Sequence, residues 1–149
     1  MIERPVIRVA TVKDAPALKR CMVSAYAAYS ERMGTSVLPP IELDYAEEIA
    51  SFPTWVSTLN GKVVGGFTMM FAEDHASIAK IAVSPSSHGH GLGRTLMAFA
   101  ESEAKRKGAP EARLATHVRL TENVSLYSYL GWSEYDRDEN RVYMKKRIS

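Results

Sequence analysis

The chain has 149 residues, 46% of them hydrophobic and 24% charged, which is the composition of a globular protein rather than of a disordered segment. A chain of this length can bury one hydrophobic core, so we expect a single domain that spans residues 1–149. With 19 basic and 17 acidic residues, the formal net charge is only +2, which argues against a nucleic-acid partner.

No segment of the sequence has the length and character of a membrane anchor. The most apolar stretch, residues 63–72, is much shorter than the roughly 20 residues that a membrane-spanning helix requires. The first residues lack the apolar run of a signal peptide, and the single cysteine, Cys21, has no partner for a disulfide or a multi-cysteine metal site. We therefore expect a cytoplasmic protein with no membrane partner and no metal.

The first predicted elements are a strand and a long helix. A strand at Val6–Ala10 precedes Thr11 and Asp14, which can form a capping box at the start of a helix. From Ala15 to Tyr29, apolar residues recur at intervals of three and four, and Gly34 is placed to end this helix.

The middle of the chain predicts a short helix and three antiparallel strands. The helix is expected within residues 41–51. The strands Trp55–Leu59 and Lys62–Phe71 flank Asn60-Gly61, the dipeptide best suited to a tight hairpin turn. The next strand, Ala76–Val83, is apolar on both faces, so we expect it to be central and covered on both sides.

The last part of the chain begins with a strongly amphipathic helix that starts at about Gly91 and ends at Gly108. Its charged face predicts an ion pair between Glu101 and Lys105, four residues apart. The following elements are a strand at Ala112–Val118, a short helix from Thr121 or Glu122 to Gly131, and terminal strands at Trp132–Tyr135 and Arg141–Lys146. The pattern predicts a mixed α/β fold with about seven mostly antiparallel strands and about four helices. The crossover through the amphipathic helix should make Ala76–Val83 and Ala112–Val118 parallel.

A glycine-rich turn connects the central strand to the amphipathic helix, and its sequence is His88-Gly89-His90-Gly91-Leu92-Gly93-Arg94. The first turn of a helix has unpaired N–H groups and partial positive charge, so it can bind a pyrophosphate without a lysine. Arg94 can add charge assistance. The turn lacks the Gly-Lys-Ser/Thr ending of a P-loop, and its glycine spacing differs from that of a dinucleotide-binding fold. By itself, the turn is also compatible with a connection that binds no ligand.

Two segments resemble the GNAT superfamily of N-acetyltransferases. The run Ile81-Ala82-Val83-Ser84-Pro85, followed by His88-x-x-Gly91-x-Gly93-Arg94, is similar to the acyl-CoA motif of that family. His88 stands where the family usually has glutamine or arginine. The second segment, Thr121-Glu122-Asn123-Val124-x-Leu126-Tyr127-x-x-Leu130-Gly131-Trp132, resembles the end of the GNAT domain, with tryptophan in place of the usual phenylalanine.

The resemblance implies that acetyl-CoA lies between the strands Ala76–Val83 and Ala112–Val118, with its pyrophosphate at the glycine turn. Tyr127 would protonate the departing thiolate as a general acid, and it shares a helix face with Asn123. The implied cofactor-binding residues are Ile81, Ala82, Val83, His88, Gly89, His90, Gly91, Leu92, Gly93, Arg94, Asn123 and Tyr127.

The general base is less clear from the sequence. Several family members place an acid near the positions of Ala79 and Lys80, and neither residue is acidic here. His117, at the end of a predicted strand, is the main candidate catalytic base, with His75, Glu73 and Asp74 as weaker candidates. A hydrogen-bonded structural role for His117, and a base provided by solvent, both stay open.

The expected function is transfer of an acetyl group from acetyl-CoA to a primary amine by direct attack in a ternary complex. The acceptor can be a small molecule or the amine of a protein or peptide, and the resemblance also makes a homodimer possible. Two alternatives are a non-catalytic module that binds or senses acyl-CoA, and a nucleotide-binding protein that uses the same glycine turn.

Overall fold

The computed structural model describes residues 4–32, 43–87 and 91–148. They form a seven-stranded sheet with the order β1-β2-β3-β4-β5-β7-β6, in which only β4 and β5 are parallel neighbours. In chain order, the elements are β1 Val6–Val9, α1 Ala15–Arg32, α3 Tyr45–Ser51, β2 Thr54–Leu59, β3 Lys62–Phe71, β4 Ala76–Val83, α4 Leu92–Arg106, β5 Glu111–His117, α5 Thr121–Tyr129, β6 Ser133–Arg137 and β7 Arg141–Arg147. The predicted fold class is confirmed. No helix in the described ranges is long and apolar enough to cross a membrane.

Local sequence signals set several of these boundaries. Asn60 and Gly61 adopt positive φ angles of 55° and 76°, as the predicted β2–β3 hairpin requires. Asp44 caps α3, because its Oδ1 accepts hydrogen bonds from the backbone N–H groups of Ala46 and Glu47. The predicted end of α1 at Gly34 lies outside the described residues.

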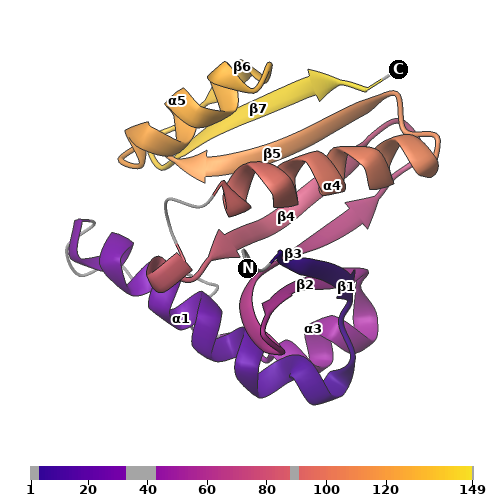
Figure 1. The fold of residues 1–149 in the computed structure, drawn as a ribbon. Helices are drawn as coiled ribbons and strands as arrows, with labels where there is room; N and C mark the ends of the chain where they lie inside the picture. Colours follow the sequence, from indigo (N-terminus) through magenta and orange to yellow (C-terminus); the bar gives the residue numbers. More distant parts are fainter. Residues whose placement is uncertain (1–3, 33–42, 88–90, 149) are drawn as a thin grey trace.

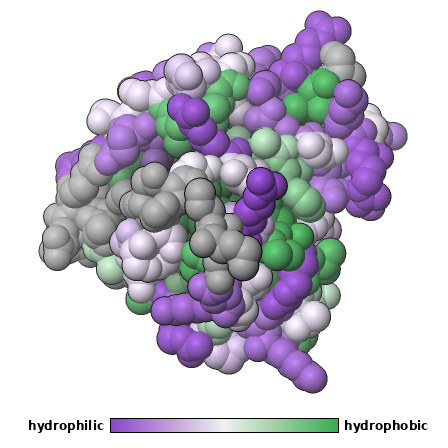
Figure 2. All heavy atoms as spheres, in the orientation of Figure 1, coloured by the Kyte–Doolittle hydropathy of each residue, from purple (hydrophilic) through white to green (hydrophobic). Residues whose placement is uncertain are grey.

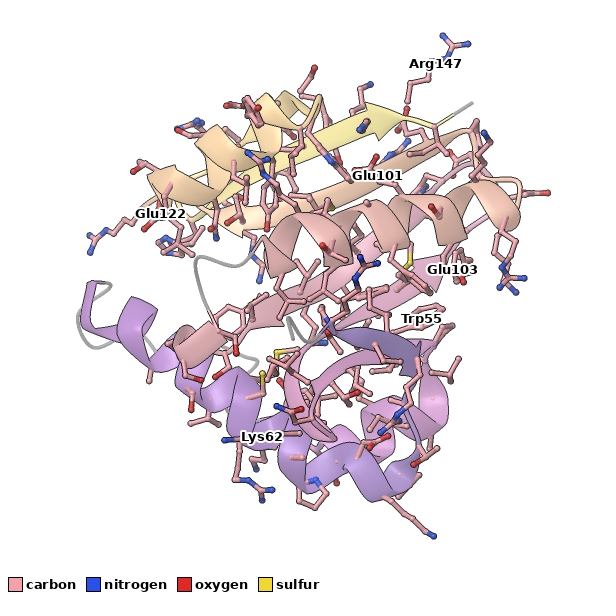
Figure 3. The ribbon with its side chains drawn as sticks, in the orientation of Figure 1. Trp55, Lys62, Glu101, Glu103, Glu122 and Arg147 are labelled. Atoms are coloured by element: carbon pink, nitrogen blue, oxygen red, sulfur yellow. The ribbon has the colours of Figure 1, made fainter. Side chains whose placement is uncertain are left out.

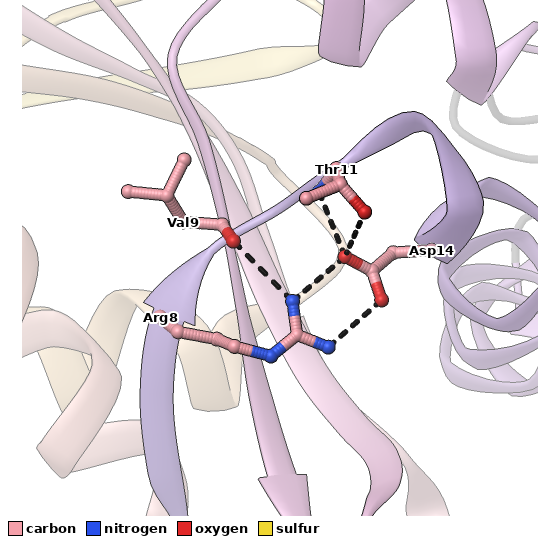
Figure 4. Close-up of polar contacts among 4 residues, drawn as sticks. All are labelled: Arg8, Val9, Thr11 and Asp14. Atoms are coloured by element: carbon pink, nitrogen blue, oxygen red, sulfur yellow. Dashed lines mark hydrogen bonds and ion pairs between the residues drawn. The ribbon is translucent and has the colours of Figure 1, made fainter.

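The capping box at the start of α1 forms as predicted, but it opens a short 3₁₀ turn at Val12–Asp14 before the α-helix begins. Asp14 Oδ2 accepts a hydrogen bond from the Thr11 N–H at 2.7 Å. Arg8 on β1 donates to both oxygens of the same carboxylate, at 2.8 and 2.9 Å (Figure 4). The capping residue therefore also ties the edge strand to the first helix.

Helices α1 and α4 pack on opposite faces of the sheet, and two adjacent glycines on β3 mark the contact. A Cβ atom on Gly66 would lie 2.8 Å from Leu18 of α1, whereas a Cβ atom on Gly65 would lie 3.0 Å from Leu96 of α4. Successive residues of a strand point to opposite faces, so the two helices cover the two sides of β3. Figure 1 shows α4 across the middle of the sheet, α1 and α3 at one end, and α5 at the other.

The hydrophobic core has a part on each face. The larger part lies under α4 and contains Phe67, Leu96 and Met144, and the smaller part lies under α1 and contains Leu18 and Val56. On the α4 side, hydrophilic side chains cover most of the surface and leave smaller hydrophobic areas between them (Figure 2). The apolar residues of α4 are accordingly turned inward, as its sequence pattern predicted.

The predicted ion pair between Glu101 and Lys105 is replaced by a contact between more distant parts of the chain. Glu101 lies on the side of α4 that faces β7 (Figure 3), where its carboxylate is 2.7 Å from Lys146 Nζ and accepts a hydrogen bond from Trp132 Nε1 at 3.3 Å. A partly buried partner on another element replaces the helical neighbour because α4 brings Glu101 next to β7. The interaction ties α4 to the last part of the sheet.

Candidate functional site

Strands β4 and β5 are paired over only three residues at one end. The pairs are Ala76 with Ala112, Ser77 with Arg113 and Ile78 with Leu114. Beyond them, β4 continues to Val83 and β5 to His117 without forming a ladder with each other. The sheet therefore opens between these strands, at the place where the sequence predicted the acyl-CoA site.

A β-bulge in β4 lies at the start of this opening. Thr68 of β3 pairs with Lys80 and Met69 pairs with Ile78, so Ala79 is an extra residue in β4. A bulge rotates the strand and changes which face the following side chains occupy. Lys80 consequently reaches α3, where its Nζ lies 2.6 Å from Glu48 Oε2, and both side chains are largely buried.

A cavity of about 1130 Å³ follows the opening and passes through the sheet. Ala25 and Tyr26 of α1 line it on one face, and Met97 of α4 and Tyr127 of α5 line it on the other. The Tyr26 hydroxyl donates a hydrogen bond to the carbonyl of Ile81 at 3.3 Å. The cavity exceeds the usual size of a site for a drug-sized ligand, which is about 300–1,000 Å³, so it has room for two substrates.

The start of α4 forms the described part of the glycine turn. Gly91 is the N-cap residue of α4, with a φ of 71°, and no side chain at this position caps the helix. The N–H groups of Leu92, Gly93 and Arg94 precede the first intrahelical hydrogen bond, which Thr95 donates to Gly91. A Cβ atom on Gly93 would meet no atom within 4 Å, so the space beside Gly93 is open. Leu92, Gly93 and Arg94 line the cavity, whereas the predicted contacts His88, Gly89 and His90 lie outside the described residues.

The other predicted cofactor-binding residues also come together at the cavity. Ile81, Ala82 and Val83 line it from β4, and Asn123 and Tyr127 line it from α5. Asn123 Nδ2 donates a hydrogen bond to Thr116 Oγ1 at 3.3 Å, and the Tyr127 ring packs 6.5 Å from the Trp132 ring. The Arg94 guanidinium lies 5.0 Å from the centre of the exposed Tyr129 ring. The specific role of each residue stays a prediction.

The two histidines at the cavity differ in their hydrogen bonds. His117 Nδ1 accepts the backbone N–H of Arg119 at 3.1 Å, so the neutral ring carries its proton on Nε2. His75 Nδ1 lies 2.7 Å from Asp74 Oδ1, so it donates to this carboxylate and leaves Nε2 able to accept a proton. The hydrogen bond from His75 holds the pKa of Asp74 below its usual range. This geometry favours His75 over His117 as a base, the reverse of the order that the sequence suggested.

The structure adds two features that the sequence analysis missed. The bulge at Ala79 has no local sequence signal, because it arises from the pairing of β4 with β3. The pair of Glu48 and Lys80 joins residues from a weakly predicted helix and a strand, 32 positions apart. Glu48 places a carboxylate next to β4 even though β4 itself has none there.

Nucleophilic and metal chemistry have little support in the described residues. Cys21 is buried in α1, and burial raises the pKa of its thiol to about 11, which disfavours the reactive thiolate. No three His, Cys, Asp or Glu side chains of the described ranges are grouped so that they could hold a metal ion.

Comparisons with known proteins place the chain in one family. A sequence profile described as "Acetyltransferase (GNAT) family" matches residues 21–132. The chain is 31% identical to the uncharacterized N-acetyltransferase YjgM of Escherichia coli (strain K12), over 90% of this chain and 85% of that protein. It is 35% identical to the amino-acid acetyltransferase of Mycobacterium tuberculosis (strain ATCC 25618 / H37Rv), over 63% of this chain and 51% of that protein. Its fold matches the crystal structure of the PaiA N-acetyltransferase of Thermoplasma acidophilum in complex with coenzyme A, with a TM-score of 0.85, 20% identity, and coverage of 97% of this chain and 99% of that one.

Proposed function

We propose that this N-acetyltransferase, which belongs to the acetyltransferase (GNAT) family, transfers the acetyl group of acetyl-CoA directly to a primary amine in a ternary complex. The observation that carries the proposal is the opening between β4 and β5, with a bulge at its closed end and the start of α4 beside it. The acceptor is the amine of a small molecule or of a protein or peptide. The Mycobacterium relative is by name an enzyme that acts on amino acids.

The residues present fit acetyl-CoA. The N–H groups of Leu92, Gly93 and Arg94 would bind its pyrophosphate, and the absence of a Cβ atom at Gly93 leaves the backbone accessible. The edge of β4 from Ala79 onward would bind the pantetheine arm through backbone groups, and Asn123 would contact it from α5. Side-chain identity matters little for such backbone contacts, which explains how His88 can replace the usual residue of the family.

The reaction forms a bond between the amine nitrogen and the acetyl carbon and breaks the bond between that carbon and sulfur. Negative charge develops on the thioester oxygen as the amine attacks. A backbone N–H group at the bulge of β4 would donate a hydrogen bond to this oxygen, and such preorganised donors are worth a large part of the rate enhancement in acyl transfer.

Two protons must move during this transfer. The amine would lose its proton to His75 Nε2, directly or through water, while Asp74 holds the imidazole in the required tautomer. Tyr127 would protonate the departing thiolate. A thiol and a phenol have ordinary pKa values of about 8.5 and 10, so this proton transfer does not require a strongly perturbed site.

Substitution Tyr127→Phe tests the proposal because it removes the hydroxyl and keeps the ring that packs near Trp132. We expect the turnover number to fall about a hundredfold, as is typical for loss of a general acid, while the dissociation constant for CoA stays nearly unchanged. Thiol release measures turnover, and calorimetry measures CoA binding. The control is Tyr129→Phe on the same helix, whose exposed ring does not line the cavity.

Two outcomes would contradict parts of the proposal. Transfer at the parental rate by the Tyr127→Phe variant, with chemistry shown to limit the rate, would make Tyr127 a packing residue and solvent the proton donor. A parent protein that binds CoA but releases no thiol with any amine would instead be a binding or sensing module.

A further inference from the structure

The last three strands of the sheet present one face that differs from the face under α4. Ala112 and Leu114 of β5 and Val142 and Met144 of β7 belong to the core under α4. Because side chains alternate along a strand, the residues between them point to the opposite face, which is the face that α1 covers over β3. Arg113 and its neighbour on β7, Lys145, therefore lie on this second face, and both contact the ring of Tyr135, at 5.9 and 5.4 Å from its centre.

Positive side chains from three strands line the cavity on this second face: Lys80 of β4, Arg113 of β5 and Arg141 of β7. Arg141 belongs to the same face as Arg113, because it pairs in register with His117, four residues after Arg113. Among the described lining residues, the only carboxylate is that of Glu122, which belongs to α5. Three cationic side chains thus lie in the half of the cavity away from α4 and α5.

These three cations differ in how fully their charge is compensated. Lys80 is paired with the buried Glu48, and Arg113 donates through Nε to Glu111, with Asp74 at 3.9 Å. Arg141 has no carboxylate of the described residues within ion-pair distance of its guanidinium. The nearby Asp138 already accepts the Arg141 backbone N–H and the Tyr143 hydroxyl, each at 2.8 Å.

We propose that the acceptor is a primary amine that also carries a carboxylate, and that Arg141, supported by Arg113, binds this carboxylate. The inference rests on the proposed function, since it assigns the α4 and α5 side of the cavity to acetyl-CoA and the opposite side to the acceptor. A guanidinium matches a carboxylate with two parallel hydrogen bonds, and the charge of Arg141 disfavours an acceptor that has a second positive charge. Arg141 is then a specificity-determining residue that fixes the anionic end of the acceptor while its amine reaches the bulge of β4.

The test compares amines that carry a carboxylate with amines that do not. Thiol release from acetyl-CoA is measured with the standard amino acids, with the amides of the same amino acids, with the corresponding decarboxylated amines and with spermidine. We expect kcat/KM for the best amino acid to exceed that for its amide by roughly tenfold or more, which is the usual size of a charged hydrogen-bonding contact. Arg141→Gln should remove most of this difference by raising KM with little change in kcat. The matched control is Arg137→Gln on the same hairpin, which removes a positive charge outside the cavity.

The outcomes separate this inference from the proposed function. Faster transfer to amides, to decarboxylated amines or to spermidine would overturn the carboxylate assignment and leave the transferase intact. An unchanged preference in Arg141→Gln, with a changed one in Arg113→Gln, would also overturn the role of Arg141. No transfer to any of these amines, nor to peptides and proteins with free amines, by a parent protein that binds CoA would contradict the proposed function itself.

Discussion

The sheet has two parts that are built differently. In the part formed by β1 to β4, α1 packs on one face of β3 and β4 and α4 packs on the other, and adjacent glycines on β3 let the helices approach closely from both sides. In β5, β7 and β6 the core lies on one face only, and all five residues of β6 are exposed. Figure 1 shows these parts side by side, with α4 across both. Because α4 and the core beneath it span both parts, the sheet can open between β4 and β5 while the two parts stay joined.

The connection between the two parts is concentrated at one end. The three residue pairs of β4 and β5 lie there, and so does the contact of Glu101 with Lys146, whose strand neighbour is Ala112. Helix α4 begins at the open end with Gly91 as its N-cap and ends at the closed end with Arg106. The candidate site is therefore a seam between two parts of one sheet, which α4 and the core beneath it hold together.

Each part contributes one histidine to the seam, and substituting them should have different effects. We expect His75→Gln to lower kcat/KM about a hundredfold, because it removes the base that Asp74 orients. His117→Gln should have little effect, since its Nδ1 already accepts the Arg119 N–H. The measurement is kcat/KM against pH. In the parent, kcat/KM should fall at acidic pH as the base becomes protonated. This fall should disappear in His75→Gln and persist in His117→Gln. The opposite pattern would return the role of base to His117.

The part of the sheet that is covered on both faces should not tolerate an added methyl group. Gly66→Ala would place a Cβ atom 2.8 Å from both Leu18 Cδ1 and the backbone oxygen of Trp55. The Leu18 side chain can shift, but the backbone of β2 cannot move easily. We therefore expect a loss of about 2 kcal/mol in the free energy of unfolding. Urea denaturation measures it. Stability equal to that of the parent would mean that α1 packs more loosely on the sheet than we describe.

At the seam, replacing a glycine by alanine should weaken ligand binding and leave the stability of the fold nearly unchanged. Gly93 has a helical conformation, and an added Cβ atom would meet no protein atom within 4 Å. We expect Gly93→Ala to keep or slightly raise the melting temperature, because alanine favours the helix, and to weaken CoA binding roughly tenfold. Calorimetry and thermal denaturation give both values. Position 91 is less suitable, since its φ of 71° would strain any side chain. Unchanged affinity in Gly93→Ala would place the pyrophosphate elsewhere.

The smallest expected effect concerns the edge of the sheet that is farthest from the seam. Arg8, and to a smaller extent the Thr11 N–H, lowers the pKa of Asp14 to about 2. The unfolded chain binds the proton more tightly, so the interaction stabilises the fold above about pH 4 and its contribution is lost as the pH falls towards 2. Because the pair is partly exposed, we expect a contribution of only about 1 kcal/mol.

The measurement for this edge is urea denaturation of the parent and of Asp14→Asn between about pH 2 and pH 6. The variant should be less stable near neutral pH, and the gap should close in acid. Arg8→Gln should reproduce most of the effect while it leaves the capping box in place. Parallel stability curves for parent and variants would contradict the assignment.

Much of this molecule follows from its sequence alone. The hairpin at Asn60-Gly61, the bounds of β4 and the start of α4 depend on residues close together in the chain, so local turn chemistry and hydrophobic periodicity determine them. The glycine turn and the segment around Tyr127 are recognisable in the sequence because they resemble motifs of the GNAT family. Residues of both segments, among them Gly93, Asn123 and Tyr127, line one cavity in the structure.

Only the tertiary structure decided the chemistry around that cavity. The bulge at Ala79 depends on the register of β3 against β4, and the partner of Glu101 depends on where α4 crosses β7. The hydrogen bonds that distinguish His75 from His117 depend on the backbone geometry of a turn and of a strand end. These features arise from contacts whose free energy is settled when the whole sheet assembles, and no local pattern of residues encodes them.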